Sequence, residues 1–526
     1  MTKTLPDMRV TPEVKHDRHE QQSIVLLFIG LLVTMLMSSL SQTVLSTAMP
    51  TIVGELNGAD HMAWVITAFI LASTVVMPIY GRISDIFGRK AILVVAIVLF
   101  MAGSVVGGLA QDMEWLIIAR VVQGLGGGGL MILSQAAMAD VIPARDRGKY
   151  MGVFGAVFAV CSVAGPLVGG WLTDGPGWRW AFWMNIPLAI LAIVAVLMFL
   201  HPHRREQHVP KIDYLGMALI AAATTAIVLV CTWGGTTYDW NSATVIGLIA
   251  GAVVCIVAFI FVERKAESPV MPGYLFKSRN FLLTTGASLV VGIAMFGTLG
   301  YMPTYIQMVT GVNASEAGLL MTPMMGAVLI TSIASGQIVS RTGRYKAFPI
   351  VGLIILSVGL VLLSTLTVDS PVWVMCCWLA VIGIGIGFSM QILTLVVQNE
   401  FPGRVVGTAT AANNYFRQVG ATVGSAIVGS FFSSRLVDLL TEKFSQLPAG
   451  STGDLGATSL TPAVVNGLPD VVRQPIIEAY NEALLPILLY IVPLVLVGLV
   501  LVCFVQEKRL ATTVANEDAD SVAVTA

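Results

Sequence analysis

The chain has 526 residues, of which 56% are hydrophobic and only 11% charged, and its formal net charge is −1. Soluble domains carry about 25% charged residues, so this composition excludes an ordinary soluble fold and predicts a chain made mostly of membrane-spanning helices. It contains no Lys- and Arg-rich tract of the kind that binds nucleic acid. The six cysteines lie in apolar runs without Cys-x-x-Cys spacing, which predicts buried thiols and neither disulfides nor a metal site.

Residues 1–22 form a polar, charged N-terminal segment that precedes the first apolar run. They lack the short apolar core and small-residue cleavage site of a cleaved signal peptide. The first apolar run is itself long enough to remain in the membrane. We therefore expect the chain to be inserted through its own helices, with 1–22 as a cytoplasmic tail.

Long apolar runs follow one another through the rest of the chain. A membrane-spanning helix needs about 20 mostly apolar residues. Fourteen such runs occur, near 24–48, 62–80, 91–110, 115–138, 150–172, 181–200, 213–233, 243–262, 281–301, 316–339, 347–366, 371–394, 406–433 and 483–505. The sequence predicts an all-α polytopic membrane protein with 14 transmembrane helices.

The distribution of basic residues predicts the orientation of these spans. If the N-terminal tail and every even-numbered loop are cytoplasmic, most of the 29 Lys and Arg fall on that side, as the positive-inside rule requires. We therefore expect a multi-pass protein of the cell membrane with both termini in the cytoplasm. The exceptions lie inside spans or on the other face: Arg120, Arg179, Arg417, Arg435, Lys443 and Arg473.

Two pairs of similar segments indicate an internal repeat. Segments 81–90 and 336–344 both read Gly, six residues, Gly-Arg, and each joins two apolar runs. Segment 143–148 resembles 402–407 and follows two spans later in each case. Parallel repeats of helix bundles characterise one large class of secondary transporters.

The repeat predicts two six-helix bundles, formed by spans 1–6 and 9–14, with spans 7 and 8 inserted between them. An outward segment rich in Ser, Thr, Gly and Pro, at about 436–482, is expected to be a long loop. The expected units are the N-terminal tail 1–22, the first bundle 23–200, the inserted helices with their linkers 201–280, the second bundle 281–505 and a cytoplasmic C-terminal tail 506–526.

Four motifs occur in order at matching spans: Gly81-x3-Asp85-x2-Gly88-Arg89-Lys90, Arg120-Val121-Val122-Gln123-Gly124, Gly165-Pro166-Leu167-Val168-Gly169-Gly170 and the segment Trp178 to Pro187. With them, the chain resembles the major facilitator superfamily over nearly its whole length, and in particular its fourteen-span drug:proton antiporters of the QacA/EmrB type. The resemblance implies the major-facilitator fold and proton-coupled efflux of small hydrophobic or amphipathic compounds by alternating access. It implies no cofactor; the expected partners are the proton gradient, the substrates and membrane lipids.

The chain departs from this family at three positions. The family usually has an acid in the outer half of helix 1, where this chain has Ser41 in the segment 40–44. In relatives that acid is implicated in handling cations or protons, so specificity for cationic drugs is not carried over to this chain. Cys161 stands where a Gly is common in helix 5, and Ser340 stands in the second Gly-Arg loop where Asp85 stands in the first. Any latch formed by these loops is therefore expected mainly in the N-terminal half.

The paired Gly-Arg loops are candidates for a conformational latch. In that interpretation Asp85 accepts hydrogen bonds from a nearby helix end or Arg and stabilises one state of the alternating-access cycle. In the alternative, the basic residues only keep the loops inside. The latch candidates are Gly81, Asp85, Gly88, Arg89, Gly336, Gly343 and Arg344.

Four charged residues near membrane depth are candidates for proton coupling or substrate orientation: Arg120, Asp140, Glu316 and Arg417. Each also has a structural interpretation. Arg120 could reach the outer interface, and Asp140 with Arg417 could form a salt bridge at the inner gate. Glu316 could be a solvated helix start.

Two further groups of residues come from the spans. The antiporter motif of span 5 consists of Gly165, Pro166, Gly169 and Gly170. The proline is expected to bend or loosen the helix. This kink either moves during transport or is static. A cavity lined by aromatic and polar side chains would suit varied apolar compounds. The cavity candidates are Gln42, Trp64, Gln123, Tyr301 and Tyr305.

These features favour a proton-coupled multidrug efflux transporter. The alternatives are export of a siderophore, lipid or metabolite by the same fold, or a membrane scaffold that transports nothing. The sequence has no Gly-x4-Gly-Lys-[Ser/Thr] phosphate loop, which argues against an ATP-driven pump. It has neither a His-Glu-x2-His nor a Gly-x-Ser-x-Gly motif, so we expect no enzyme activity.

Overall fold

The computed structural model describes residues 18–56, 61–200, 211–235, 237–445 and 462–510. These residues are almost entirely helical. The helices are α1 (Arg18–Leu56), α2 (Met62–Phe87), α3 (Arg89–Gly108), α4 (Met113–Val141), α5 (Ala144–Asp174), α6 (Trp180–Trp183), α7 (Asn185–Phe199), α8 (Tyr214–Trp233), α9 (Ala243–Glu263), η2 (Leu275–Lys277), α10 (Arg279–Leu299), α11 (Met302–Thr310), α12 (Ala314–Leu320), α13 (Thr322–Thr342), α14 (Ala347–Ser364), α15 (Val372–Glu400), α16 (Gly403–Ser445), α17 (Pro462–Asn466) and α18 (Asp470–Cys503).

Fourteen segments of the described chain are long and apolar enough to cross a membrane. Three of them join two neighbouring helices into one span: α6 with α7, α10 with α11, and α12 with α13. The predicted all-α architecture with 14 membrane helices is therefore confirmed. The apolar runs alone were sufficient for this prediction because a run of about 20 apolar residues has the length of a spanning helix, which satisfies its backbone polar groups within the segment, whereas a strand of a membrane barrel needs only about 9–11 residues.

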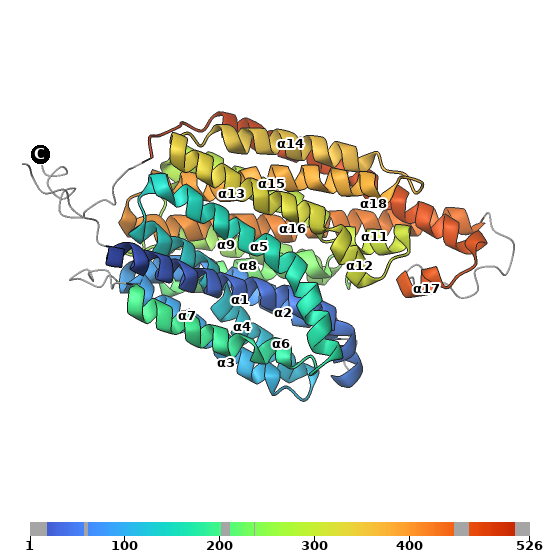
Figure 1. Cartoon of the computed structure of the whole chain (residues 1–526), viewed down its shortest axis with the longest axis horizontal. Helices are drawn as coiled ribbons and strands as arrows, with labels where there is room; N and C mark the ends of the chain where they lie inside the picture. Colours follow the sequence, from blue (N-terminus) through green and yellow to red (C-terminus); the bar gives the residue numbers. More distant parts are fainter. Residues whose placement is uncertain (1–17, 57–60, 201–210, 236, 446–461, 511–526) are drawn as a thin grey trace, which may run out of the picture.

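The helices form two groups, one on each side of the molecule. Figure 1 shows α3, α4, α6 and α7 on one side and α13, α14, α15 and α18 on the other. Each group has its own apolar core: one contains Leu31, Phe100 and Phe154, and the other contains Leu356 and Leu488. The two groups are the two half-bundles that the repeat predicts.

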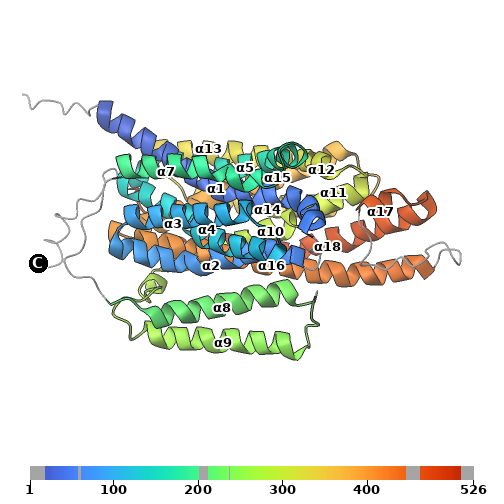
Figure 2. The ribbon, with the colours of Figure 1, turned by 90° about the horizontal axis from the view of Figure 1, so that it is seen from below.

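Two helix pairs form the most extensive contacts between the halves. Helix α2 packs against α16, and α5 packs against α13. These pairs correspond under the internal repeat, because α2 and α13 carry the Gly-Arg loops while α5 and α16 follow the second repeated segment. The inserted helices α8 and α9 form a pair at the side of the bundle, where α8 contacts α2 and α16 (Figure 2).

The long loop expected at about 436–482 is largely wrong. Helix α16 continues to Ser445 and α18 begins at Asp470, with α17 between them. The 43 residues of α16 span about 65 Å at about 1.5 Å per residue, roughly twice the hydrocarbon thickness of a bilayer. Residues 446–461 lie outside the described part of the chain.

Side-chain packing explains why these extensions remain helical. Leu436 and Leu440 at the end of α16 are buried against Val472 and Ile476 of α18. The Lys443 ammonium lies 2.9 Å from a Glu478 carboxylate oxygen and 3.0 Å from one of Glu482. Apolar residues three and four apart on facing helices can pack together beyond the membrane-length segment. A search for apolar runs of membrane length does not detect this pattern.

Candidate functional site

A buried cluster of polar side chains lies where α2 ends and α3 begins. We name this end of the molecule the loop end of the bundle. Gly88 separates the two helices with φ of 93°, a conformation that side chains other than glycine rarely adopt. This turn places Asp85 in the last turn of α2 and Arg89 at the start of α3, and both are buried. From here their side chains reach the other half of the molecule.

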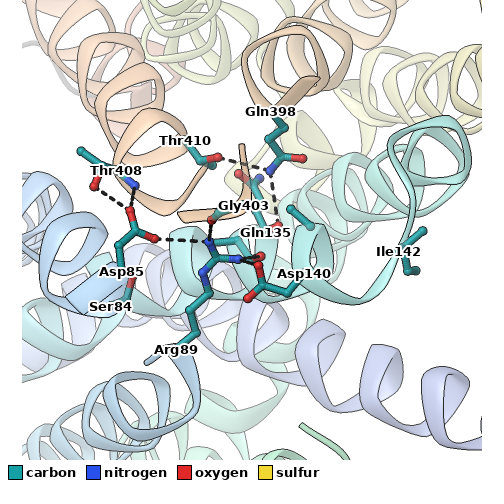
Figure 3. A network of polar contacts seen from close by, with 12 residues as sticks. Ser84, Asp85, Arg89, Gln135, Asp140, Ile142, Gln398, Gly403, Thr408 and Thr410 are labelled. Atoms are coloured by element: carbon teal, nitrogen blue, oxygen red, sulfur yellow. Dashed lines mark hydrogen bonds and ion pairs between the residues drawn. The ribbon is translucent and has the colours of Figure 1, made fainter. Parts of the chain in front are cut away.

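Asp85 binds the N-terminal part of α16 across the interface between the halves (Figure 3). Its Oδ2 accepts hydrogen bonds from the backbone N–H and the hydroxyl of Thr408, each at 2.7 Å. Its Oδ1 accepts from Nη2 of Arg89 at 3.2 Å. A Cβ atom at Gly407 would lie 2.3 Å from Oδ1, so the close approach requires glycine there.

Arg89 connects three helices through one guanidinium. It forms ion pairs with Asp85 of α2 and with Asp140 of α4. It also donates to the carbonyl of Ala136 at 2.5 Å and to that of Gly403, at the start of α16, at 2.9 Å. The salt bridge between Asp140 and Arg417, one of the alternatives for these residues, is not among the ion pairs of the described chain, where Asp140 pairs with Arg89. Sequence separation could not reveal which of two arginines reaches this carboxylate.

Arg147 is a buried participant that sequence reasoning did not select. It extends from the first turn of α5 and donates to the carbonyls of Ile142 at 2.7 Å, Ala139 at 2.5 Å and Gln398 at 3.5 Å. The available signal was the repeated segment 143–148, in which it stands next to Gly148. With Arg147 included, the loop end buries two carboxylates, of Asp85 and Asp140, and two guanidiniums, of Arg89 and Arg147. Because the positive and negative charges are equal in number, no ion is buried without a counter-charge, which would be costly.

The second interface at the loop end, between α5 and α13, uses backbone contacts, a hydroxyl and the Arg145 guanidinium, which donates to the carbonyls of Ser340 at 3.4 Å and Arg341 at 3.3 Å. A Cβ atom at Gly336 would lie 2.1 Å from the carbonyl oxygen of Gly148, so these helices touch at glycine. The Ser340 hydroxyl donates to the carbonyl of Arg145 at 2.7 Å. Gly343 ends α13 with φ of 73°, and Arg344 beyond it is exposed. Gly81 has the corresponding role in α2, because its Cβ would lie 2.3 Å from Cβ of Ala411 in α16.

A layer of buried amide side chains lies between this cluster and the centre of the molecule; Figure 3 shows Gln135 and Gln398 of this layer. Gln398 donates to the carbonyl of Gln135 at 3.3 Å, and Asn414 donates to Oε1 of Gln135 at 3.0 Å. Several amide atoms of the layer have no hydrogen-bond partner in the described chain, including Nε2 of Gln135 and both polar atoms of Gln391. We define the amide layer as Gln135, Gln391, Gln398, Asn413 and Asn414.

A cavity of about 430 Å³ lies between the halves, beyond the amide layer, and we name it the central cavity. It is lined by α1, α2, α4 and α5 of one half, by α10, α15 and α16 of the other, and by the inserted helix α8. Its lining includes Ser38, Gln42, Thr67, Met77, Met131, Phe158, Thr232, Met295, Phe296, Tyr301, Arg417 and Gln418.

Two of the five predicted cavity residues, Gln42 and Tyr301, line the central cavity. The other three lie elsewhere. The ring centroid of Trp64 lies 5.8 Å from that of Trp233. Gln123 is fully buried beside Arg120, and the Tyr305 hydroxyl donates to Asn481 at 2.6 Å. The rotation of each helix decides which face meets the cavity, and the apolar pattern of a buried span does not encode that rotation.

Arg120 is buried within the first half and does not reach an outer interface. Its Nε donates to the carbonyl of Val65 at 3.2 Å, and Nη1 donates to Oε1 of Gln123 at 2.5 Å. Its guanidinium carbon lies 4.2 Å from the centroid of the Phe69 ring, a cation–π contact. Arg120 therefore connects α4 to α2.

Glu316 is exposed at the start of α12. Its carboxylate accepts from the backbone N–H of Asn313 at 3.1 Å, and the Asn313 side chain accepts from the N–H of Glu316 at 2.8 Å. This reciprocal arrangement is a capping box. The position of Glu316 agrees with the structural interpretation given above, in which this residue is a solvated helix start.

Helix α5 continues through Pro166, from Ala144 to Asp174. The glycines of its motif allow α5 to approach α1 closely. A Cβ atom at Gly165 would lie 2.0 Å from Oγ1 of Thr43, and one at Gly169 would lie 2.1 Å from Oγ1 of Thr47. At Gly170 a Cβ would meet nothing within 4 Å. Within the described ranges, no three His, Cys, Asp or Glu side chains gather to hold a metal ion.

Comparison with known proteins agrees with this architecture. Residues 31–425 match the family model described as Major Facilitator Superfamily. The chain is 40% identical to an MFS-type transporter of Mycobacterium tuberculosis, over 94% of this chain and 71% of that protein. It is 37% identical to the multidrug transporter protein MdtP of Bacillus subtilis, over 89% of this chain and 88% of the relative. It is 33% identical to Multidrug resistance protein 3 of the same organism, over 94% of this chain and 97% of that relative.

Solved structures show the same fold at low sequence identity. The human organic anion transporter MFSD10 matches with a TM-score of 0.62 and 14% identity, over 92% of this chain and all of that one. The proton:xylose symporter XylE matches with a TM-score of 0.57 and 16% identity, over 94% of this chain and 98% of that one. From its two half-bundles, its 14 helices and these matches, the chain belongs to the Major Facilitator Superfamily, whose members carry small molecules across membranes.

Proposed function

We propose that this protein is a proton-coupled exporter of hydrophobic or amphipathic compounds that works by alternating access. The observation that carries the proposal is a central cavity between the halves, combined with a loop end where Asp85 and Arg89 join those halves. Relatives named as multidrug proteins, MdtP and Multidrug resistance protein 3, support the substrate class.

The structure corresponds to one state of the proposed cycle. The loop end is closed by the contacts of α2 with α16 and of α5 with α13. The central cavity extends toward the opposite end of the bundle, where Ala63 at the start of α2 and Ser430 of α16 line it. The basic residues of the even-numbered loops support a cytoplasmic loop end. In that orientation the state faces outward.

Proton coupling in this proposal uses Asp85 and Asp140, since span 1 has Ser41 where relatives of the resembled type have an acid. A proton from the outer side reaches these carboxylates through the central cavity and the amide layer, whose unpaired amide atoms can bind water. Protonation removes the charge that binds Arg89 and Thr408, so it weakens the contact between the halves. The loop end then opens, and the proton leaves to the cytoplasm.

The test is efflux of a fluorescent hydrophobic dye from proteoliposomes with an imposed pH gradient. The proposal expects dye movement that stops when the gradient is collapsed by an ionophore. The Asp140→Asn variant is expected to bind dye while losing the response to the gradient. Transport at the same rate without a gradient would refute the coupling.

A further inference from the structure

Arg417 of α16 is a buried guanidinium whose hydrogen bonding is incomplete. Its side chain lines the central cavity and the residue is 8% exposed. Nη2 donates to Oδ1 of Asn414, whereas Nη1 has no hydrogen-bond partner in the described chain. A buried guanidinium N–H that no acceptor satisfies carries a desolvation cost, which a ligand oxygen would remove.

The other buried guanidiniums are better satisfied. Arg89 has two carboxylates and two carbonyls, and Arg147 has three carbonyls. Arg120 has a carbonyl, an amide oxygen and an aromatic ring. In the described ranges, Arg417 differs from them in having both an unpaired N–H and a place in a cavity wall.

The charge of Arg417 is not balanced within the cavity. Among the described residues that line the central cavity, Arg417 is the one charged side chain, and none is Asp or Glu. No ion pair joins Arg417 to an acid of the described chain. A cation at membrane depth requires a counter-charge or water, so the field in the central cavity favours an anion over a cation.

The position of this guanidinium is well determined by its neighbours. A Cβ atom at Gly292 of α10 would lie 2.2 Å from the carbonyl oxygen of Arg417, so the two backbones touch there. Asn414, which accepts from Nη2, is itself bonded to Gln135 of the other half at 3.0 Å. These contacts orient the planar guanidinium and leave Nη1 available, which limits the entropy lost when an acceptor binds.

We propose that the central cavity binds a small amphipathic anion, with a carboxylate or sulfonate oxygen accepting from Nη1 of Arg417. The apolar body of the ligand packs against flexible methionines and aromatic rings of the lining, which adapt to varied shapes. These are Met77, Met131, Phe158, Met295, Phe296 and Met390. The volume of about 430 Å³ fits a drug-sized molecule. This inference rests on the proposed function, because it names the substrate class of the proposed exporter.

The test uses two probes of nearly the same shape, naphthalene-2-sulfonate, which is charged, and naphthalene-2-sulfonamide, which is neutral. Their affinities are measured by equilibrium dialysis against the purified full chain in phosphatidylcholine nanodiscs. The wild type is expected to bind the sulfonate at least about tenfold more tightly than the sulfonamide, as for a charge-assisted hydrogen bond. Arg417→Gln removes this preference, and Arg417→Lys retains part of it.

The control is Arg435→Gln, which removes a positive charge farther along α16, where Arg435 is exposed and donates to the Glu482 carbonyl. It should keep the full preference for the sulfonate. Unchanged sulfonamide affinity in Arg417→Gln reports an intact cavity. If Arg417→Gln does not fold, a reduced but measurable preference in Arg417→Lys, with retained sulfonamide binding, supports the role of the guanidinium.

Two results would overturn the inference: equal or absent binding of the two probes by the wild type, or a sulfonate preference that persists in Arg417→Gln. Adding phosphatidylglycerol to the nanodiscs identifies the source of the anion, because competition with the sulfonate supports a lipid anion at the same site and its absence supports a soluble one. Dialysis involves neither a gradient nor transport. Failure of gradient-driven dye efflux therefore refutes the proposed coupling and leaves the anion preference to be judged by itself.

Discussion

The carboxylate of Asp85 in the first half accepts both the backbone N–H and the hydroxyl of Thr408 in the second half, each at 2.7 Å. Both groups are buried, and the contact is completed by Arg89, which donates to the carbonyl of Gly403 at the start of α16. This relationship links a loop motif of the first half to the second repeated segment of the other half.

Asp85→Asn is expected to weaken the closure of the loop end. The amide keeps the shape of the side chain but loses the charge, and hydrogen bonds to charged groups contribute about 1.5–3 kcal/mol each. The equilibrium between closed and open states should shift by about tenfold or more toward the open one. Dye efflux from proteoliposomes should slow while the yield of folded protein stays the same.

The matched control is Ser340→Ala, at the related position of the second half. It removes a neutral hydrogen bond to the Arg145 carbonyl at 2.7 Å, so its effect on efflux should be smaller. Equal dye efflux rates in the wild type and Asp85→Asn would show that Asp85 does not act as a conformational latch.

Gly407→Ala is expected to separate α2 from α16 at the loop end. Its added Cβ would lie 2.3 Å from Oδ1 of Asp85, which is too close for any relaxed contact. In a cysteine-free background, a cysteine at position 410 should react faster with a water-soluble maleimide in this variant, because the buried Thr410 site becomes wet. Gly403→Ala, whose Cβ would meet nothing within 4 Å, is the control and should leave the labelling rate unchanged. Slow labelling in both variants would show that this glycine contact does not set closure.

Arg89 and Asp140 should be energetically coupled. Removing one partner of a buried ion pair leaves the other unpaired, so Asp140→Asn and Arg89→Gln should each lower the midpoint of thermal unfolding. The double variant should lose less stability than the sum of the single ones, by about 0.5–3 kcal/mol. The measurement is a double-mutant cycle of thermal unfolding in detergent. Strict additivity would contradict a direct pair.

Glu316→Gln should leave both efflux and its dependence on the pH gradient unchanged. The side chain is exposed, and Gln can still accept from the N–H of Asn313 in a capping box. The assay compares gradient-driven dye efflux of this variant with that of the wild type. If instead the variant transports without responding to the gradient, Glu316 carries the proton and the proposed role of Asp85 and Asp140 is wrong.

Much of the fold follows from local features of the sequence. Fourteen apolar runs were sufficient to count the membrane helices, because span length and hydropathy are local properties. The Gly-Arg loops with Asp85 and Arg89 could be recognised as a pair because their spacing is local as well. The C-terminal end of α16 and the N-terminal start of α18 could not be predicted from local features. Leu436 and Leu440 remain helical because they pack on residues more than thirty positions away in the sequence.

The sequence by itself therefore determined the class of the protein, its two related halves and the loops that meet between them. Only the tertiary structure decided that Arg89 and not Arg417 pairs with Asp140, that Arg120 binds a carbonyl and a ring, and that Gln42 rather than Gln123 meets the central cavity. These outcomes depend on how each helix is rotated and shifted against its neighbours, over distances of a few ångströms. Hydropathy within a buried span carries no record of that rotation, because nearly every face of the helix is apolar.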